Sequence, residues 1–188
     1  MTSSQRRLLA GRDAQGRSMI EDDREAQAVL HTPGGGRIVE IWRTDGRRDL
    51  STPAADVDGR PVTFAPGDGQ SSCRLVRIPP DSQRWGSGLQ AADLFASMGA
   101  MDSMQGAEPR HPGMHVTPTL DYVYVVRGEV VAVMEKGETR LAAGDVLVQR
   151  ATVHAWKNDT DADAEMFVVM IGIPGIPDGD APSPAQSS

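Results

Sequence analysis

The sequence predicts an all-β fold in which short antiparallel strands form a barrel or sandwich, and three observations support this prediction. The chain of 188 residues contains 20 Gly and 13 Pro, more than average usage, whereas aromatic residues make up only 4%. Six short apolar runs follow one another between residues 120 and 173, each bounded by Gly, Asp or Asn. Such closely spaced runs are typical of strands joined by tight turns.

The first hundred residues predict a few strands and one short helix. Residues 6–10 and 17–21 flank a turn-rich segment and predict a hairpin. Strands are expected at 37–43 and 73–78, and the second ends at Pro79-Pro80. Residues 44–70 predict a loop, with a brief strand at 61–65. The one helix is expected at 89–100, where apolar residues recur at spacings of three and four, with Ser87 as its cap and Gly99 as its break.

Residues 120–173 predict six closely spaced strands. The predicted strands are residues 121–126, 129–135, 138–141, 146–149, 153–157 and 165–171. Residues with strong turn preference, such as Arg127-Gly128 and Ala143-Gly144-Asp145, join them.

Charge and cysteine content exclude several classes of function. The net charge of −7 argues against nucleic acid or an anionic membrane surface as the main partner. The longest apolar run, residues 166–173, is far too short to span a bilayer, and no secretory signal is recognisable. Cys73 is the only cysteine, which excludes an intramolecular disulfide framework and a multi-cysteine metal site. We therefore expect a cytoplasmic protein.

The candidate active-site residues are two histidines, a threonine and an aspartate. His115, Thr117 and Asp121 share parity along an extended chain, so their side chains can lie on one face. His154 lies at the start of another strand. Two imidazoles and a carboxylate that converge inside a barrel could hold a divalent metal and leave positions open for water or substrate.

The residues around this centre resemble the two sequence motifs of the cupin family. Residues 115–128 resemble the first motif, with His115 at its start, Asp121 where the family has Glu, and Gly128 at its end. Residues 144–158 resemble the second motif, which begins at Gly144 and ends at His154-x-x-x-Asn158.

This sequence departs from the motifs at several positions. Thr117 stands where the first motif has its second His, Arg150 replaces a Pro, and Thr152 replaces a Gly. The second motif is also one residue short before His154.

The resemblance, which covers about residues 111–173, implies a cupin-type double-stranded β-helix, also called a jelly-roll barrel. It implies one divalent metal ion (Fe, Mn, Ni or Zn) with His115, Asp121 and His154 as ligands and catalytic residues. Thr117 is then expected to line the substrate pocket. Trp156 shares parity with His154 and is expected to line the pocket too.

Other interpretations of these residues stay open. His115 and His154 could be hydrogen-bonded barrel histidines without a metal, and Asp121 could bond backbone N–H groups or pair with an arginine. His111 is expected to be exposed in a loop, outside the metal's ligand set.

Arginines and two tyrosines complete the expectations about side chains. Arg84, Arg110 and Arg150 could receive a substrate carboxylate, although solvation at the surface is the usual fate of an isolated arginine. Tyr122 and Tyr124 have parity opposite to Asp121 and should face outward or into a second sheet or subunit.

The expected organisation has three parts. Residues 1–71 form an N-terminal hairpin and strand extension packed on the barrel or on a partner subunit, residues 72–173 form the barrel, and residues 174–188 are a disordered tail. Uncovered sheet edges and the strand-rich arm favour a homodimer.

Three functions are compatible with these residues. The first is a metal-dependent enzyme acting on an oxygenated small molecule as a dioxygenase, decarboxylase, isomerase or dehydratase. The second is a metal-free acid-base isomerase or dehydratase, and the third is a ligand-binding barrel without catalysis.

Overall fold

Burial alternates along the strands of the second half of the chain, as the alternating sequence predicts. The computed structural model describes residues 5–44, 57–86, 88–104 and 109–175. In β11 (Ala164–Gly172) every second side chain from Ala164 onward is buried. In β6 (Thr119–Arg127) the side chains of Asp121 and Val123 are buried. Tyr122 and Tyr124, which alternate with them along the strand, are exposed as expected.

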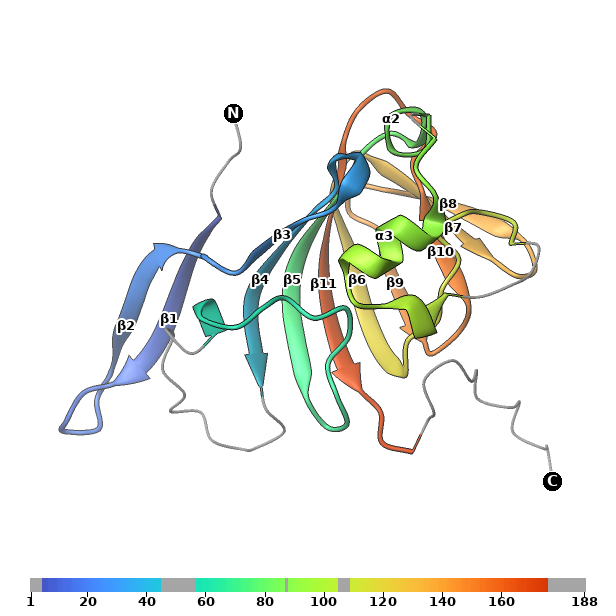
Figure 1. Ribbon diagram of the computed structural model, residues 1–188. Coiled ribbons are helices and arrows are strands. Elements are labelled where there is room, and N and C mark those ends of the chain that lie inside the picture. The colour runs from blue at the N-terminus through green and yellow to red at the C-terminus, as the bar shows by residue number, and fades with distance from the viewer. Residues whose placement is uncertain (1–4, 45–56, 87, 105–108, 176–188) are drawn as a thin grey trace.

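Most of the strands form two antiparallel sheets (Figure 1). The larger sheet has the order β3-β4-β5-β11-β6-β9 and the smaller one the order β10-β7-β8. Besides β6 and β11, the strands of the two sheets are β3 (Val29–His31), β4 (Arg37–Thr44), β5 (Ser71–Ile78), β7 (Glu129–Met134), β8 (Glu138–Ala142), β9 (Val146–Arg150) and β10 (His154–Lys157). This strand-dominated antiparallel architecture confirms the predicted all-β fold class.

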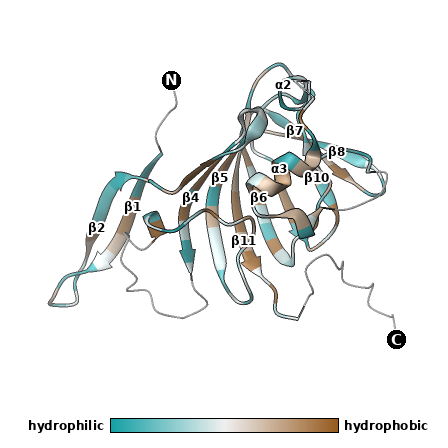
Figure 2. Ribbon diagram, viewed as in Figure 1, coloured by the Kyte–Doolittle hydropathy of each residue, from teal (hydrophilic) through white to brown (hydrophobic). Residues whose placement is uncertain are grey.

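The hydrophobic core lies between these two sheets. Val123 and Val125 of β6 and Met166 of β11 pack in one cluster with Val130 and Ala132 of β7. Because all five of these side chains are almost completely shielded from water, their burial is the main force that holds the two sheets together. Figure 2 shows hydrophobic residues along much of β11.

The N-terminal part adds a separate hairpin to this barrel. β1 (Arg6–Arg12) and β2 (Ser18–Glu25) pair only with each other and project from one end of the molecule (Figure 1). By contrast, β3 and β4 continue the larger sheet beyond β5. The boundary between an extension and a barrel at residue 72 stays a prediction.

The helices α2 and α3 lie between β5 and β6 and differ from the sequence prediction. The helix expected at 89–100 is shorter, α3 (Ala91–Ser97), and α2 (Asp81–Arg84) precedes it. Short 3-10 turns η1 (Pro33–Gly35) and η2 (Met101–Ser103) were not predicted either. Residues 61–65 form no strand, because prolines at 61 and 66 limit ladder pairing there.

A few expectations fall outside the part of the chain that the structure describes. They are the Ser87 cap, residues 45–56 of the expected loop, and most of the expected C-terminal tail. Within the described residues, no helix combines the length and the apolar character that crossing a membrane requires.

Candidate active site

The two candidate histidines lie side by side in the barrel. His115 precedes β6 and forms an antiparallel bridge with His154, the first residue of β10. Each backbone N–H donates to the carbonyl of the other residue, with both N···O distances 2.9 Å. Because directly opposed residues of an antiparallel pair point to the same side, the two imidazole rings meet, with centroids 4.3 Å apart.

Main-chain carbonyls orient both imidazole rings. Nδ1 of His115 lies 2.8 Å from the carbonyl oxygen of Gly113. Nδ1 of His154 lies 2.9 Å from the carbonyl oxygen of Thr152 and 3.0 Å from the side-chain nitrogen of Gln149. A proton on Nδ1 of His115 satisfies the Gly113 carbonyl and leaves the lone pair on Nε2, where a metal can bind. At His154 a proton on Nδ1 would serve the Thr152 carbonyl in the same way, whereas Nδ1 without the proton would accept from the side-chain nitrogen of Gln149.

Burial keeps both rings neutral. Removal from water lowers the pKa of His115 to about 4, and the nearby positive charge of Arg84 acts in the same direction. Burial likewise lowers the pKa of His154 to about 3, with a further contribution from His115. Both imidazoles are therefore uncharged near neutral pH and can act as ligands or as proton acceptors.

Asp121 points into the same cavity from β6 and has an incomplete set of hydrogen bonds. Its side chain is buried, and among the described residues its Oδ1 has no hydrogen-bond partner. Burial raises the pKa of Asp121 to about 6, opposed by a hydrogen bond from Thr119 and by the charge of Arg74. A carboxyl group with such a pKa can exchange a proton near neutral pH.

These groups line one cavity of about 140 Å³. An engineered apolar cavity of about 150 Å³ admits benzene, so this one fits a molecule about the size of one ring. Aromatic side chains surround the histidines: Phe64 and Phe95 contact His115 at ring-centroid distances of 5.2 and 5.7 Å. Trp156 meets His154 edge to face at 5.5 Å.

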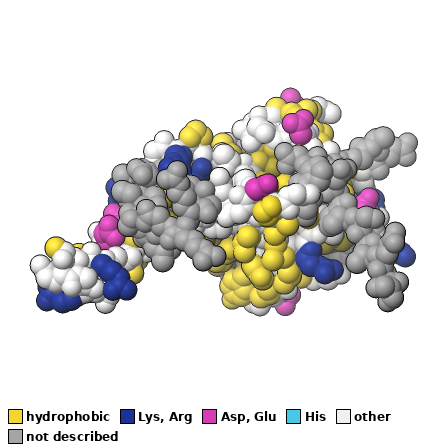
Figure 3. Space-filling view, turned by 90° about the horizontal axis from the view of Figure 1, so that it is seen from below, with side chains coloured by type: hydrophobic (Ala, Val, Ile, Leu, Met, Phe, Trp, Pro, Cys, Tyr) yellow, Lys and Arg dark blue, Asp and Glu magenta, His cyan; other side chains and the backbone are white. Residues whose placement is uncertain are grey.

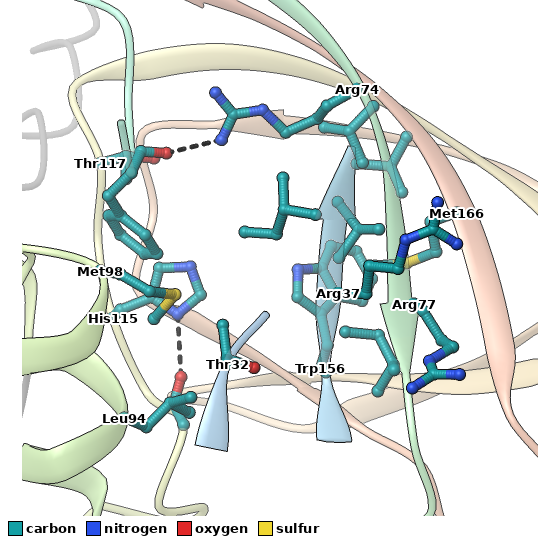
Figure 4. Close-up of a pocket in the computed structure, with 18 of the residues that line it drawn as sticks. Thr32, Arg37, Arg74, Arg77, Leu94, Met98, His115, Thr117, Trp156 and Met166 are labelled. Carbon is teal, nitrogen blue, oxygen red and sulfur yellow. Dashed lines mark hydrogen bonds between the residues drawn. The ribbon is translucent and has the colours of Figure 1, made fainter. Parts of the chain in front are cut away.

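The structure brings all five predicted site residues into this cavity. They are His115, Thr117, Asp121, His154 and Trp156. Figure 4 shows His115 and Thr117 on one side of the cavity, with Arg74 and Met166 on other sides. The helix α3 contributes Leu94 and Phe95, and Met98 follows directly after it.

Arginines at the cavity differ from those that the sequence suggested. Arg84 lines the cavity and is buried, which corrects the expectation of a solvated side chain. It is held there because its guanidinium donates to Asp81 at 2.8 Å and to the Trp156 carbonyl at 2.6 Å. Arg110 and Arg150 are not among the residues that line the cavity.

Arg74 is a cavity residue that the sequence analysis missed. It donates to the buried Glu40 at 3.1 Å and to the Phe64 carbonyl at 2.9 Å. Its position in strand β5 shares parity with Val76 and Ile78, whose side chains also face inward. That shared parity is the sequence signal that could have identified it.

His111 is buried, which corrects the expectation that it is exposed. Its Nε2 lies 2.8 Å from Asp81, and the Gly113 N–H donates to its Nδ1 at 3.0 Å. Because Gly113 also accepts the proton of His115, the Asp81–His111 pair supports the turn that orients His115. His111 itself is not among the cavity residues.

Three metal ligands were expected: His115, Asp121 and His154. The two histidines alone fit a divalent transition metal better than the set of three does. Two neutral imidazoles and a buried carboxylate are suitable donors. Among the described residues, however, no group of three or more His, Cys, Asp and Glu side chains is arranged to hold a metal ion. Asp121 therefore shares the cavity with the histidines but does not form a three-residue coordination group with them.

Comparison with known proteins agrees with this architecture. Residues 103–170 match the Cupin_2 family, described as a cupin domain. Oryzines biosynthesis cluster protein J of Aspergillus oryzae is 38% identical over 76 residues, which cover 37% of this chain and 42% of that protein. The cupin-domain-containing oxidoreductase virC of Hypocrea virens is 46% identical over 48 residues, 25% of each chain.

A further curated relative matches a similarly short segment of this chain. Solved structures resemble this one at low sequence identity. Phomopsin biosynthesis cluster protein D of Diaporthe leptostromiformis is 50% identical over 46 residues, 24% of each chain. The chain therefore spans less than half the length of these curated relatives. The structure of a predicted oxalate decarboxylase from Thermotoga maritima has a TM-score of 0.40 and 14% identity, covering 77% of this chain and 90% of that chain.

Proposed function

We propose that this chain, whose residues 103–170 match a cupin domain, is a metal-dependent enzyme acting on a small oxygenated organic molecule. His115 and His154 would hold one divalent metal ion (Fe, Mn, Ni or Zn). The observation that carries the proposal is the pair of adjacent neutral imidazoles, His154 buried and His115 half-buried, whose Nδ1 atoms lie within hydrogen-bond distance of main-chain carbonyls. Two rings fixed in this way have a low reorganisation cost on binding a metal.

The bound metal would supply Lewis-acid polarisation of a substrate oxygen or a site for dioxygen. The chain's own residues define the rest of the chemistry. Asp121 is positioned to accept or return a substrate proton, because its pKa of about 6 leaves it mostly ionised at pH 7. Phe64, Phe95 and Trp156 exclude water and provide flat apolar surfaces for an unsaturated substrate.

The cavity favours a substrate with one ring or a short chain and an anionic oxygen function. The cavity volume of about 140 Å³ limits the substrate to this size. Arg84 supplies a buried positive charge beside the histidines, and a carboxylate or enolate is the complementary group. The names of the relatives in biosynthesis clusters support a role in the synthesis of a small natural product.

Elemental analysis of tag-free protein tests the metal. We expect about one equivalent of a transition metal in the wild type and its loss in His115→Gln and His154→Gln. The matched control is His31→Gln, because His31 is exposed in β3 and is not among the residues that line the cavity. Wild-type protein that holds no metal after reconstitution with Fe, Mn, Ni and Zn would reject the metalloenzyme.

Acid-base catalysis without metal is the second candidate, favoured by the carboxyl group of Asp121. A buried carboxyl with a pKa near 6 is suited to proton abstraction beside a carbonyl. Turnover that persists in chelator and is abolished by Asp121→Asn would support this candidate. Ligand binding without any turnover would instead support a binding barrel.

A further inference from the structure

A second cavity lies where β4 ends and β5 begins, and we call it the β4–β5 cavity. Its volume is about 170 Å³, and it shares no lining residue with the cavity of the two histidines. In Figure 1 this end of the two strands lies at the bottom of the molecule, the side from which Figure 3 is seen. No Asp or Glu is among its described lining residues, which include two arginines and four hydroxyl residues: Arg43, Arg60, Thr44, Thr63, Ser71 and Ser72.

A β-bulge in β4 places Arg43 at this cavity. In the ladder of β4 and β5, Glu40 pairs with Arg74 and Arg43 pairs with Ser72, with a register shift between Glu40 and Trp42. The extra residue puts Glu40 and Arg43 on one face of the strand, although regular alternation would put residues three apart on opposite faces. Because Arg74 and Ser72 are both buried, this face points inward.

Two donor atoms at this cavity are buried without a hydrogen-bond partner. They are Oγ of Ser72, a residue that is only 3% exposed, and Nε of Arg43. Neither atom has an acceptor within the part of the chain that the structure describes. Because a buried donor without an acceptor is unfavourable, a ligand that offers acceptor oxygens would be stabilised here.

Thr44 and Ser71 supply a further donor. Their hydroxyl oxygens are 3.1 Å apart, and the Ser71 N–H donates to Oγ1 of Thr44 at 2.9 Å. Whichever hydroxyl donates to the other, one hydroxyl proton of the pair stays available for a ligand. Both residues line the cavity.

The cavity also carries excess positive charge. Glu40 is fully buried and accepts from both Arg74, at 3.1 Å, and Arg43, at 3.5 Å. One carboxylate thus serves two guanidinium groups, and the other hydrogen bond of Arg43 goes to the uncharged Pro61 carbonyl at 2.9 Å. Arg60, which is exposed, adds a second positive charge to the lining. The complementary ligand is an anion.

We propose that the β4–β5 cavity binds a phosphate group, carried by inorganic phosphate or by a small phosphorylated molecule. Guanidinium groups match the geometry of phosphate oxygens. A phosphate offers at least three acceptor oxygens and a carboxylate only two, so the phosphate can receive bonds from the arginines, Ser72 and the Thr44–Ser71 pair together. The site does not rest on the proposed function, because none of its residues lines the histidine cavity.

Calorimetric titration of the full chain with inorganic phosphate tests the site. A chelator is present so that no bound metal can hold the phosphate. We expect one phosphate per chain, and Arg60→Gln should raise its dissociation constant about tenfold through loss of a charge-assisted hydrogen bond. Arg150→Gln is the matched control and should bind phosphate as the wild type does, because Arg150 is exposed and lines neither cavity. Circular dichroism establishes that each variant is folded.

Ser72→Ala separates binding from folding. It should raise the dissociation constant for phosphate about fivefold, because a neutral hydrogen bond is lost. Without phosphate, this variant should unfold at a temperature no lower than the wild type, because the substitution removes a buried hydroxyl that has no partner. A purely structural Ser72 would instead lower the unfolding temperature and leave the phosphate affinity unchanged.

Titration with glycerol phosphate and acetate identifies the ligand class. Tighter binding of glycerol phosphate than of inorganic phosphate indicates a phosphorylated molecule as the ligand, and equal or weaker binding indicates free phosphate. Acetate should bind much more weakly than either, because a carboxylate has fewer acceptor oxygens.

Four results would overturn the proposal. They are wild-type protein that binds no phosphate at millimolar concentration, Arg60→Gln that binds it as tightly as Arg150→Gln does, and acetate that binds as tightly as phosphate. The fourth is a phosphate affinity that falls in His154→Gln but not in Ser72→Ala, which would place the anion in the histidine cavity. None of these measurements depends on the metal or on catalysis.

Discussion

His115 and His154 titrate far below their ordinary range because the protein removes both rings from water. The unfolded chain binds a proton on each ring near pH 6.5, whereas the folded chain binds them only near pH 4 and 3. Below pH 6.5 the unfolded state therefore holds more protons, so the free energy of unfolding contributed by these rings falls as the pH falls. Asp121 acts oppositely, because its folded pKa is raised to about 6.

The histidine contribution can be isolated by comparing variants of the metal-free protein. Between pH 6 and 4.5, we expect the wild type to lose about 1 kcal/mol of unfolding free energy per pH unit relative to His154→Gln. Urea unfolding in the presence of chelator at a series of pH values measures this difference. Parallel pH profiles of the two proteins would show that His154 is not held neutral by burial.

At the scale of secondary-structure elements, glycines fix the turns that bring the strands into register. Gly128, between β6 and β7, has φ of +75°. A Cβ atom at this position would lie 3.0 Å from both the Cα of Ala164 and the carbonyl oxygen of Asp163. The turn thus requires glycine both for its backbone conformation and for the close approach of β11.

Gly128→Ala should therefore cost more than a glycine substitution in an open turn. Gly137 is the matched control, because its φ is +87° but nothing lies within 4 Å of a Cβ there. We expect Gly137→Ala to lower the unfolding free energy by about 1 kcal/mol from backbone strain. Gly128→Ala should lose about 1–3 kcal/mol more from overpacking. Equal losses in chemical denaturation would contradict the close approach.

At the scale of the whole molecule, a buried arginine anchors the hairpin. The side chain of Arg7 is only 1% exposed. It donates to Asp58 at 2.9 Å across 51 residues of sequence and to Asp22 at 3.2 Å. This ion pair ties β1 and β2 to a distant segment of the chain and fixes the direction in which the arm projects.

Arg7→Met should loosen the arm and lower the unfolding free energy by about 3 kcal/mol, because Asp58 then keeps only the partly exposed Arg24 as an ion-pair partner. Limited proteolysis should then cleave the hairpin well before the barrel. The control is Arg6→Met, which removes an exposed pair with Asp23 and should have no measurable effect. Unchanged cleavage of the hairpin in Arg7→Met would show that the arm is held by other contacts.

The sequence alone determined the strands of the barrel and the position of the histidines. Alternation of apolar and polar residues is a local property, and it sets which side chains of β6 and β11 face inward whatever lies around them. Gly128 and Gly144 mark turns because the chain reverses there with positive φ, which few other residues adopt. The spacing of His115, Asp121 and His154 within the two motifs likewise placed them in one cavity.

Only the tertiary structure decided which polar residues are buried around that cavity. His111 and Arg84 are buried because each forms a hydrogen bond with the Asp81 carboxylate. Arg74 is buried because it forms an ion pair with Glu40 on a neighbouring strand. Burying a charge is favourable only when its partner is in place. Asp81 is only three residues from Arg84, but the partners of His111 and Arg74 lie 30 and 34 residues away in sequence, so local pattern cannot supply them.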